Sequence, residues 1–270
     1  MSEDEATVEI AGSEIRLTQF SDYEQVLLAV FAEHYEEGDE EIEFEKDEFA
    51  DAADDLGLRI RNIPDVVYAF RSRRPLPDPI TTIGDWIIQP AGKGSYKFQL
   101  LQSAPQFDLN FEAYQPIEIY NSVPEVVQKF LRDDEQSLLT TILYNRVIDI
   151  FTGLTCFHIQ NHYRASVPGT GQVELDSFYV GVDDKGELYA IPIEAKGAAE
   201  SEKIGRVQVA HMSELAQQDF PNLDRRILAI KELEDGTICA VEFSEGDSPD
   251  DYKVRQVRRF DLIREDRTRP

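Results

Sequence analysis

Residues 172–197, QVELDSFYVGVDDKGELYAIPIEAKG, decide the fold of this chain. Both arms of the stretch are rich in β-branched and aromatic residues, which favour strands. The central residues 184–186, Asp-Lys-Gly, fit a three-residue hairpin loop with Gly186 at the left-handed position that such loops need. The register that follows from this loop places Asp176 directly opposite Glu194.

The predicted hairpin gathers charged side chains on one face. Because side chains alternate along a strand, Glu194 and Lys196 share a face, which Asp176 enters from the opposite strand. Glu174 joins this acidic face, whereas Ala195 points the other way. A shift of one residue would move Asp176 to the opposite face, so the predicted site depends on the register of the hairpin.

An acidic residue two positions before a lysine occurs three times in the chain, but only Glu194 and Lys196 close an apolar run. One interpretation is an ordinary cross-strand salt bridge at a strand end. The opposition of Asp176 and Glu194 favours another, because like charges that face each other destabilise a sheet unless a cation lies between them. Two carboxylates beside a lysine can hold Mg²⁺, or alternatively Mn²⁺, and orient a water, which is the chemistry of phosphodiester cleavage.

This arrangement resembles the core motif of the PD-(D/E)xK nuclease superfamily, which includes many restriction endonucleases, Holliday-junction resolvases and repair nucleases. The motif is an aspartate, here Asp176, followed after a gap by Glu194-Ala195-Lys196; Leu175 stands where the name-giving proline would be. The resemblance covers about residues 131–245. It implies that Asp176 and Glu194 bind the metal with the Ala195 carbonyl, and that Lys196 positions or activates the attacking water.

The resemblance implies an α/β (α+β) fold, a restriction-endonuclease-like mixed sheet flanked by helices. Its order is helix, three antiparallel strands, helix and strand. Periodicity predicts the remaining elements in that order: a helix at 133–152 ending at Gly153, a strand at 156–167, a helix at 198–217, and strands at 226–230 and 237–243.

The same resemblance implies two accessory residues. Many members of the superfamily place an acidic residue on the first helix to complete the metal shell, and Glu135 is the candidate. The alternative is a solvated acid in the first turn of a helix, where the helix dipole favours it. Gln208 lies on the second predicted helix, where some branches carry a glutamine near the active site; a solvent-facing glutamine is its alternative.

The N-terminal half contains a second pattern. Apolar periodicity predicts helices at 22–36, 46–56 and 64–72, then strand-like runs at 82–89 and 95–101. Basic residues cluster after the apolar run 63–70 of the third helix and on both sides of residues 94–96 in the hairpin: Arg71, Arg73, Arg74, Lys93 and Lys97. Three short helices and a basic-tipped hairpin resemble a winged helix-turn-helix domain, which implies DNA contact by the third helix and by the wing at 93–97. Dimerisation or scaffolding is the alternative role of such a domain.

The predicted organisation is a mainly helical winged-helix-like domain at 1–104, a connector at 105–130 and a nuclease domain at 131–270. Residues 38–45 are expected to form an acidic, solvated loop. The two cysteines are expected to be reduced, and four scattered histidines disfavour a zinc site. No apolar run of membrane-spanning length and no basic signal region occur, so we expect a cytoplasmic protein.

The net charge of −26 opposes nucleic-acid binding over long distances. The 53 acidic residues are spread along the chain, a pattern typical of proteins from a salt-loaded cytoplasm. At molar salt the Debye length is about 3 Å, so long-range repulsion nearly vanishes. A protein that does not bind nucleic acid is the alternative interpretation of this charge.

Together these observations predict a Mg²⁺-dependent DNA endonuclease of the restriction or defence type. Cleavage of both strands needs two active sites, which predicts a homodimer. Two alternatives remain: a repair or recombination nuclease of the same fold that acts on branched or damaged DNA, and a non-catalytic DNA-binding regulator.

Overall fold

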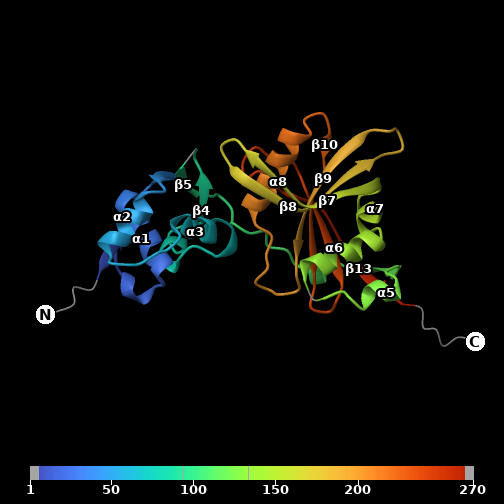
Figure 1. Cartoon of the computed structure of the whole chain (residues 1–270), viewed down its shortest axis with the longest axis horizontal. Helices are drawn as coiled ribbons and strands as arrows, with labels where there is room; N and C mark the ends of the chain where they lie inside the picture. The colour runs from blue at the N-terminus through green and yellow to red at the C-terminus, as the bar shows by residue number, and fades with distance from the viewer. Residues whose placement is uncertain (1–5, 93, 133, 265–270) are drawn as a thin grey trace, which may run out of the picture. The chain divides into compact units, whose positions relative to one another are not determined.

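The computed structural model of the chain describes residues 6–92, 94–132 and 134–264. Over these ranges it is a mixed α/β protein with eight α-helices, a large mixed sheet and two small sheets (Figure 1). Contacts divide it into two compact units. The N-terminal unit comprises the residues up to 105 and residues 168–171, and the C-terminal unit comprises 106–167 and the residues from 172 onward.

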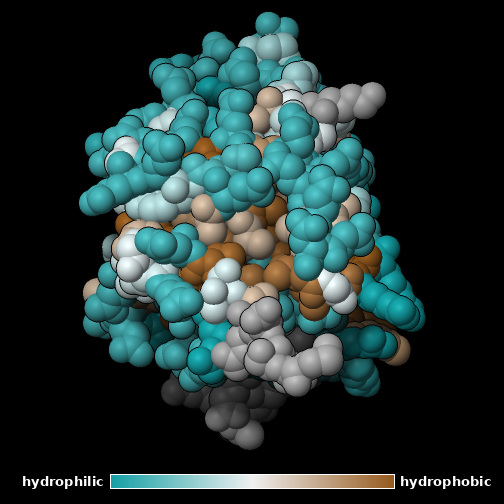
Figure 2. All heavy atoms as spheres, turned by 90° about the vertical axis from the view of Figure 1, so that its left-hand side faces the viewer, coloured by the Kyte–Doolittle hydropathy of each residue, from teal (hydrophilic) through white to brown (hydrophobic). Residues whose placement is uncertain are grey.

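The N-terminal unit combines a β-hairpin, four helices and a three-stranded antiparallel sheet of order β3-β5-β4. Its elements are β1 (Thr7–Ile10), β2 (Ser13–Arg16), α1 (Asp22–His34), β3 (Glu41–Glu45), α2 (Glu48–Asp55), α3 (Ile63–Tyr68), the π-helical turn η2 (Ala69–Arg73), α4 (Asp78–Thr81), β4 (Trp86–Pro90) and β5 (Ser95–Leu100). Aromatic rings form the centre of its core, with the Phe98 ring 4.9 Å from that of Phe31 and 4.7 Å from that of Phe44. Figure 2 shows one face of the molecule, on which a band of apolar side chains lies between hydrophilic margins.

The prediction of an acidic loop at 38–45 is wrong, because β3 occupies most of it. Ile42 and Phe44 are buried, whereas the three glutamates that alternate with them are exposed. Phe44 pairs with Tyr96 of β5. The alternation is that of a half-buried strand, and its high charge hid the period of two.

The C-terminal unit is built on an eight-stranded sheet in which β6, β13, β12, β11, β9, β8 and β7 follow one another and β10 also pairs with β9. The strands are β6 (Pro116–Tyr120), β7 (Thr155–Val167), β8 (Gly171–Val182), β9 (Leu188–Lys196), β10 (Asp224–Arg225), β11 (Ile227–Glu232), β12 (Ile238–Phe243) and β13 (Val254–Ile263). The helices are α5 (Glu125–Gln128), α6 (Glu135–Tyr144), α7 (Val147–Thr152) and α8 (Arg206–Asp219). Strand β6, inside the segment expected to be a connector, is the edge strand beside β13.

Helices cover both faces of this sheet. One apolar cluster joins α6 and α7 to Ile191 and Ile193 of β9, and the other joins α8 to Ala190 of β9 and Phe178 of β8. Neighbouring residues of β9 therefore enter opposite clusters, as the pleat requires. Strand β9 lies centrally, between β8 on one side and β11 on the other.

The predicted helix at 133–152 is interrupted. Helix α6 ends at Tyr144, and Arg146 adopts a left-handed conformation (φ 54°) before α7 begins. The Asn145 side chain accepts from the Ser122 backbone N–H (2.7 Å) and donates to the Thr141 carbonyl (2.9 Å), which fixes the break. Gly153 ends α7 in a left-handed conformation (φ 74°), as predicted.

The second predicted helix begins later than expected, at Arg206 rather than at 198. The preceding segment is held in another conformation by Lys231, which is buried on β11. Its ammonium donates to the carbonyls of Gly197 and Ala199 (2.8 Å to the second). The carboxylate of Glu202 accepts from the Gly197 backbone N–H. Both the N–H and the carbonyl of Gly197, the residue after Lys196, are therefore hydrogen-bonded.

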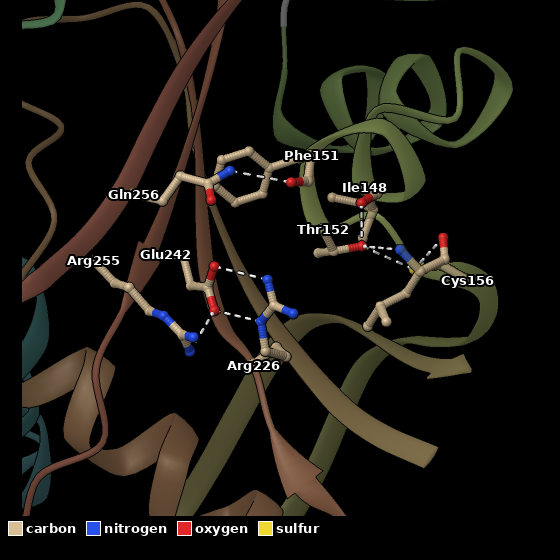
Figure 3. Close-up of polar contacts among 9 residues, drawn as sticks. Ile148, Phe151, Thr152, Cys156, Arg226, Glu242, Arg255 and Gln256 are labelled. Carbon is tan, nitrogen blue, oxygen red and sulfur yellow. Dashed lines mark hydrogen bonds and ion pairs between the residues drawn. The ribbon is translucent and has the colours of Figure 1, made fainter. Parts of the chain in front are cut away.

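An ion-pair cluster around the buried Glu242 lies at the opposite end of β11 from Lys231. Glu242 of β12 binds the guanidinium groups of Arg226 and Arg255, and Gln256 of β13 donates to the Phe151 carbonyl of α7 (3.1 Å; Figure 3). Arg226 directly precedes β11. The Gln256 bond ties β13, the neighbour of the edge strand β6, to α7.

Candidate active site

The register predicted for the hairpin is confirmed. Ser177 pairs with Ile193, and the ladder continues to Val182 and Leu188 before the turn. Gly186 has a φ of 87°, as the loop requires. Asp176 and Glu194 lie one step beyond the Ser177–Ile193 pair, where the ladder between β8 and β9 ends.

Beyond the last pair of the β8–β9 ladder, the side chain of Asp176, rather than a backbone carbonyl of β8, bonds to β9. Its Oδ2 atom accepts a hydrogen bond from the Ala195 backbone N–H (2.8 Å). The N–H and C=O groups of one strand residue point toward the same edge, so the Ala195 carbonyl lies on the edge that faces Asp176. On the other edge β9 stays paired with β11, where Lys231 lies beside Lys196. Strand β9 is thus held in place by β11 beyond the point where its pairing with β8 ends.

Glu194 is 8% exposed and receives two donors on a single oxygen. The ammonium of Lys196 (2.7 Å) and the amide of Gln208 (2.8 Å) both donate to its Oε1 atom. Gln208 lies in the first turn of α8, so the helix expected to carry it does reach the site. Ala195 is fully buried in the cluster on the α6 side, as the predicted alternation requires.

Glu135 lies in the first turn of α6, and the Asp134 side chain begins this helix by accepting from the Ser137 N–H (2.8 Å). Glu135 is exposed; partial desolvation of its carboxylate still raises its pKa, the Asp176 carboxylate raises it further, and Lys196 opposes the shift. The electrostatic coupling places Glu135 in the same group of charges as the hairpin residues. Its carboxylate accepts no hydrogen bond from the described part of the chain.

The pKa values of Glu194 and Asp176 are both raised. Burial raises the pKa of Glu194 to about 7, with a further contribution from the Asp176 carboxylate. Burial also raises the pKa of Asp176, against the Ala195 N–H and Lys196. Burial alone would lower the pKa of Lys196, but Glu194, Asp176 and Glu135 together outweigh it and the net shift is upward. Such shifts indicate unfavourable negative charge that a cation would stabilise.

The donor set fits Mg²⁺ or Mn²⁺. Asp176 Oδ1 and Glu194 Oε2 accept no hydrogen bond from the described residues. Both oxygens keep some contact with solvent. With the Ala195 carbonyl they offer three hard oxygen ligands on adjacent strands. Mg²⁺ keeps several waters and is usually bound by one or two carboxylates together with substrate phosphates.

A tight cluster of three ligands occurs elsewhere. Over the described ranges, the one group of three Asp, Glu, His or Cys ligand atoms within 4.8 Å of one another is Glu33, His34 and Glu48 in the N-terminal unit. The hairpin carboxylates and Glu135 are more widely spaced than that. An ion between Asp176 and Glu194 would therefore take much of its coordination from water or substrate.

The basic residues predicted to contact DNA lie in the N-terminal unit. Arg71 follows α3 and is half-buried, and Arg74 is exposed. Lys97 of β5 forms an ion pair with Glu41 of β3, so part of its charge is neutralised. Lys93 and the side chain of Arg73 lie outside the described residues.

Sequence reasoning missed His162 and Glu202, and it predicted that Glu174 lies on the acidic face with Asp176 and Glu194. Glu174 is turned toward β7, where His162 Nδ1 (2.8 Å) and Arg164 Nη2 (2.9 Å) bind its Oε1 atom. The sequence treated His162 as one of four scattered histidines. Its backbone conformation, a φ of 52° inside a strand, has no signal in the sequence.

Among the described residues, no helix has the length and apolar character needed to cross a bilayer. No protein family, curated protein or solved structure was found to match this chain. The geometry of the site is therefore what indicates a function.

Proposed function

We propose that this protein is a Mg²⁺-dependent DNA endonuclease of the PD-(D/E)xK type, with Mn²⁺ as an alternative ion. The observation that carries the proposal is the end of the β8–β9 ladder. There Asp176 and Glu194 are opposed, each with an oxygen that accepts no hydrogen bond from the described residues, and Lys196 is bound to Glu194.

The order of the elements supports the proposal. Helix α6 is followed by the neighbouring strands β7, β8 and β9, then by α8 and by β11, which pairs with β9 in parallel. This is the helix, three strands, helix, strand order of the superfamily core. In the N-terminal unit, α1, β3, α2, α3, β4 and β5 with the sheet order β3-β5-β4 support a winged-helix domain.

Each residue has a role that its contacts support. Asp176, Glu194 and the Ala195 carbonyl would hold the metal, which when bound supplies Lewis-acid polarisation of the phosphate and an activated water. Gln208 fixes the Glu194 carboxylate by donating to its Oε1 atom. Lys196 keeps its proton because Glu194 raises its pKa, so we assign it the orientation of the water and the stabilisation of phosphate charge rather than general-base catalysis.

The acidic surface sets the conditions of the reaction. With a net charge of −26, DNA binding at low salt is opposed over long distances, and molar salt removes most of that repulsion. Two copies of the chain would supply the two sites needed to cut both strands. Restriction or defence is the biological setting that we propose, by analogy within the superfamily.

The test is cleavage of supercoiled plasmid with Mg²⁺ across low to molar KCl. We expect discrete products from the wild type and none from Asp176→Asn, Lys196→Met or the wild type in EDTA. The hairpin turn offers matched controls, since Asp184 and Lys185 repeat the same residue types in exposed positions. Asp184→Asn and Lys185→Met are expected to cut like the wild type.

Cleavage that survives Asp176→Asn would place the chemistry outside this site. Intact plasmid at every salt and metal concentration, with a folded protein, would move the proposal to branched or damaged DNA. If those substrates also stay intact while DNA still binds, the protein is a non-catalytic regulator.

A further inference from the structure

His162 has an unusual backbone for a strand residue. Its φ is 52°, a left-handed conformation that side chains with a Cβ atom seldom adopt. Of the described non-glycine residues with positive φ, Ala11 lies in the β1–β2 turn and Arg146 at a helix junction, whereas His162 lies within β7. Conformations of this kind persist where the surrounding structure requires them, and they gather at functional sites.

The imidazole of His162 links two elements. Its Nδ1 atom lies 2.8 Å from Glu174 Oε1 on β8, and its Nε2 atom lies 3.0 Å from Gln136 Nε2 on α6. A carboxylate accepts, so Nδ1 donates to Glu174 and Nε2 accepts from the Gln136 amide in the neutral ring. The ring therefore connects α6 with β8.

The neighbouring residue binds the same amide. Asn161 Nδ2 donates to Gln136 Oε1 (3.3 Å), while Asn161 Oδ1 accepts from Ser177 Oγ (2.8 Å), next to Asp176. Adjacent residues of a regular strand point to opposite faces. The left-handed turn at His162 breaks this alternation, so that Asn161 and His162 both reach Gln136.

The two anchors of this link flank the candidate metal ligands. Gln136 follows Glu135 on α6, and Glu174 is two residues before Asp176 on β8. Burial is the main cause of the raised pKa of both Glu135 and Asp176, and interaction with His162 opposes each shift. The ring thus lies within electrostatic range of both carboxylates.

We propose that His162 is a positioning residue that fixes the first turn of α6 against β8 and thereby holds Glu135 as a third carboxylate toward the divalent cation. This inference rests on the proposed function, because Glu135 has an ion to bind only if Asp176 and Glu194 hold one. Residues that orient metal ligands through hydrogen bonds change metal affinity by about 10- to 100-fold when they are replaced.

The test measures Mn²⁺ affinity without DNA, by calorimetry, together with the melting temperature. His162→Gly removes the ring, and glycine adopts the backbone conformation without strain. We expect the Mn²⁺ dissociation constant to rise about tenfold, with a melting temperature no lower than that of the wild type. Gln136→Ala removes the same link from the exposed face of α6 and is expected to give the same loss.

Two further variants locate the effect. In a Glu135→Gln background, His162→Gly is expected to change Mn²⁺ affinity no further, because the residue it positions is already gone. Ala11→Gly relieves a similar backbone conformation (φ 51°) in the N-terminal unit, so it controls for the backbone change. It is expected to leave Mn²⁺ affinity unchanged.

The outcomes separate this inference from the proposed function. If Asp176→Asn abolishes Mn²⁺ binding while His162→Gly and Gln136→Ala bind within twofold of the wild type, the metal site stands and the positioning role falls. A loss in His162→Gly that persists undiminished in the Glu135→Gln background also overturns the role. Wild-type affinity no higher than that of Asp176→Asn overturns the metal site, and the positioning role with it.

Discussion

Two buried carboxylates of the same sheet, Glu194 of β9 and Glu242 of β12, have opposite surroundings. Glu242 is 1% exposed, and both of its oxygens accept from guanidinium groups: Arg226 binds Oε1 and Oε2, and Arg255 also reaches Oε1 (3.4 Å) (Figure 3). Glu194 uses only Oε1 and has the Asp176 carboxylate as a neighbour.

The difference distinguishes a buried carboxylate that stabilises the fold from one that is suited to bind a ligand. A buried carboxylate whose oxygens are all paired with cations is compatible with stability without any ligand. At Glu194 one oxygen is unpaired and a second carboxylate lies beside it, so the negative charge exceeds what its cationic partner, Lys196, neutralises. For this reason, more than because of the motif, we propose a metal-binding role for Glu194 and a structural role for Glu242.

The largest expected effect concerns cleavage. Glu194→Gln removes a metal ligand and should lower Mg²⁺-dependent plasmid cleavage by about a thousandfold, whereas Glu242→Gln should cut within a fewfold of the wild type at a temperature where it is folded. Initial rates at saturating Mg²⁺ measure both. Equal losses in the two variants would break the comparison, because they would give Glu242 a part in catalysis.

The next effect concerns stability, and here we expect the larger loss at Glu242 rather than at Glu194. Glu242→Ala leaves the Arg226 side chain, which is 16% exposed, without its partner and should lower the free energy of unfolding by about 3 kcal/mol, the low end for a broken buried pair. Glu194→Ala should cost less than half of that in metal-free protein, because it also relieves repulsion with Asp176. Urea unfolding in EDTA measures both values, and a larger cost for Glu194→Ala would refute the distinction.

A smaller effect follows from the pKa of Glu194. Because the folded-state pKa is raised to about 7, from about 4.3 in an unfolded chain, the protonated carboxyl favours folding. This stability is fully present below the unfolded pKa and is lost as the pH rises toward 7. Metal-free wild type should therefore lose about 2 kcal/mol relative to Glu194→Gln between pH 5 and pH 8.

Metal reverses this dependence because Mg²⁺ competes with protons for the same oxygens. The rise in melting temperature caused by Mg²⁺ should be larger at pH 8 than at pH 5 in the wild type, and absent at both pH values in Glu194→Gln. An equal rise in the two proteins would mean that Mg²⁺ binds elsewhere, with Glu33, His34 and Glu48 as the first place to look.

The hairpin was predictable from the sequence because its determinants are local. The glycine of the turn sets the loop, and the alternation of apolar residues sets the register, so the opposition of Asp176 and Glu194 followed from neighbours in the chain. The positions of Glu135 and Gln208 followed from the expected order of the elements. Their contacts, such as the bond from Gln208 to Glu194 Oε1, needed the structure.

The missed features depend on partners distant in sequence. The break after Tyr144 is fixed by Ser122, and the late start of α8 by Lys231, which binds backbone carbonyls more than thirty residues earlier. Strand β13 was missed because its basic residues conceal a strand; Arg259, for example, forms an ion pair with Asp235. The left-handed backbone of His162 is likewise a consequence of tertiary contacts with α6 and β8.

The smallest expected effect concerns the register of β8 and β9, which brings Asp176 close to Glu194. Gly186 has a φ of 87°, and a Cβ atom there would meet nothing within 4 Å, so Gly186→Ala imposes only backbone strain. We expect a loss of about 1–2 kcal/mol in the free energy of unfolding. Cleavage should be unchanged, because Phe178 is buried in one apolar cluster and Tyr179 and Ile191 in the other, and a slip by one residue would force each into the wrong cluster. A fall in cleavage larger than the stability loss explains would show that the turn, rather than the packed strands, keeps Asp176 opposite Glu194.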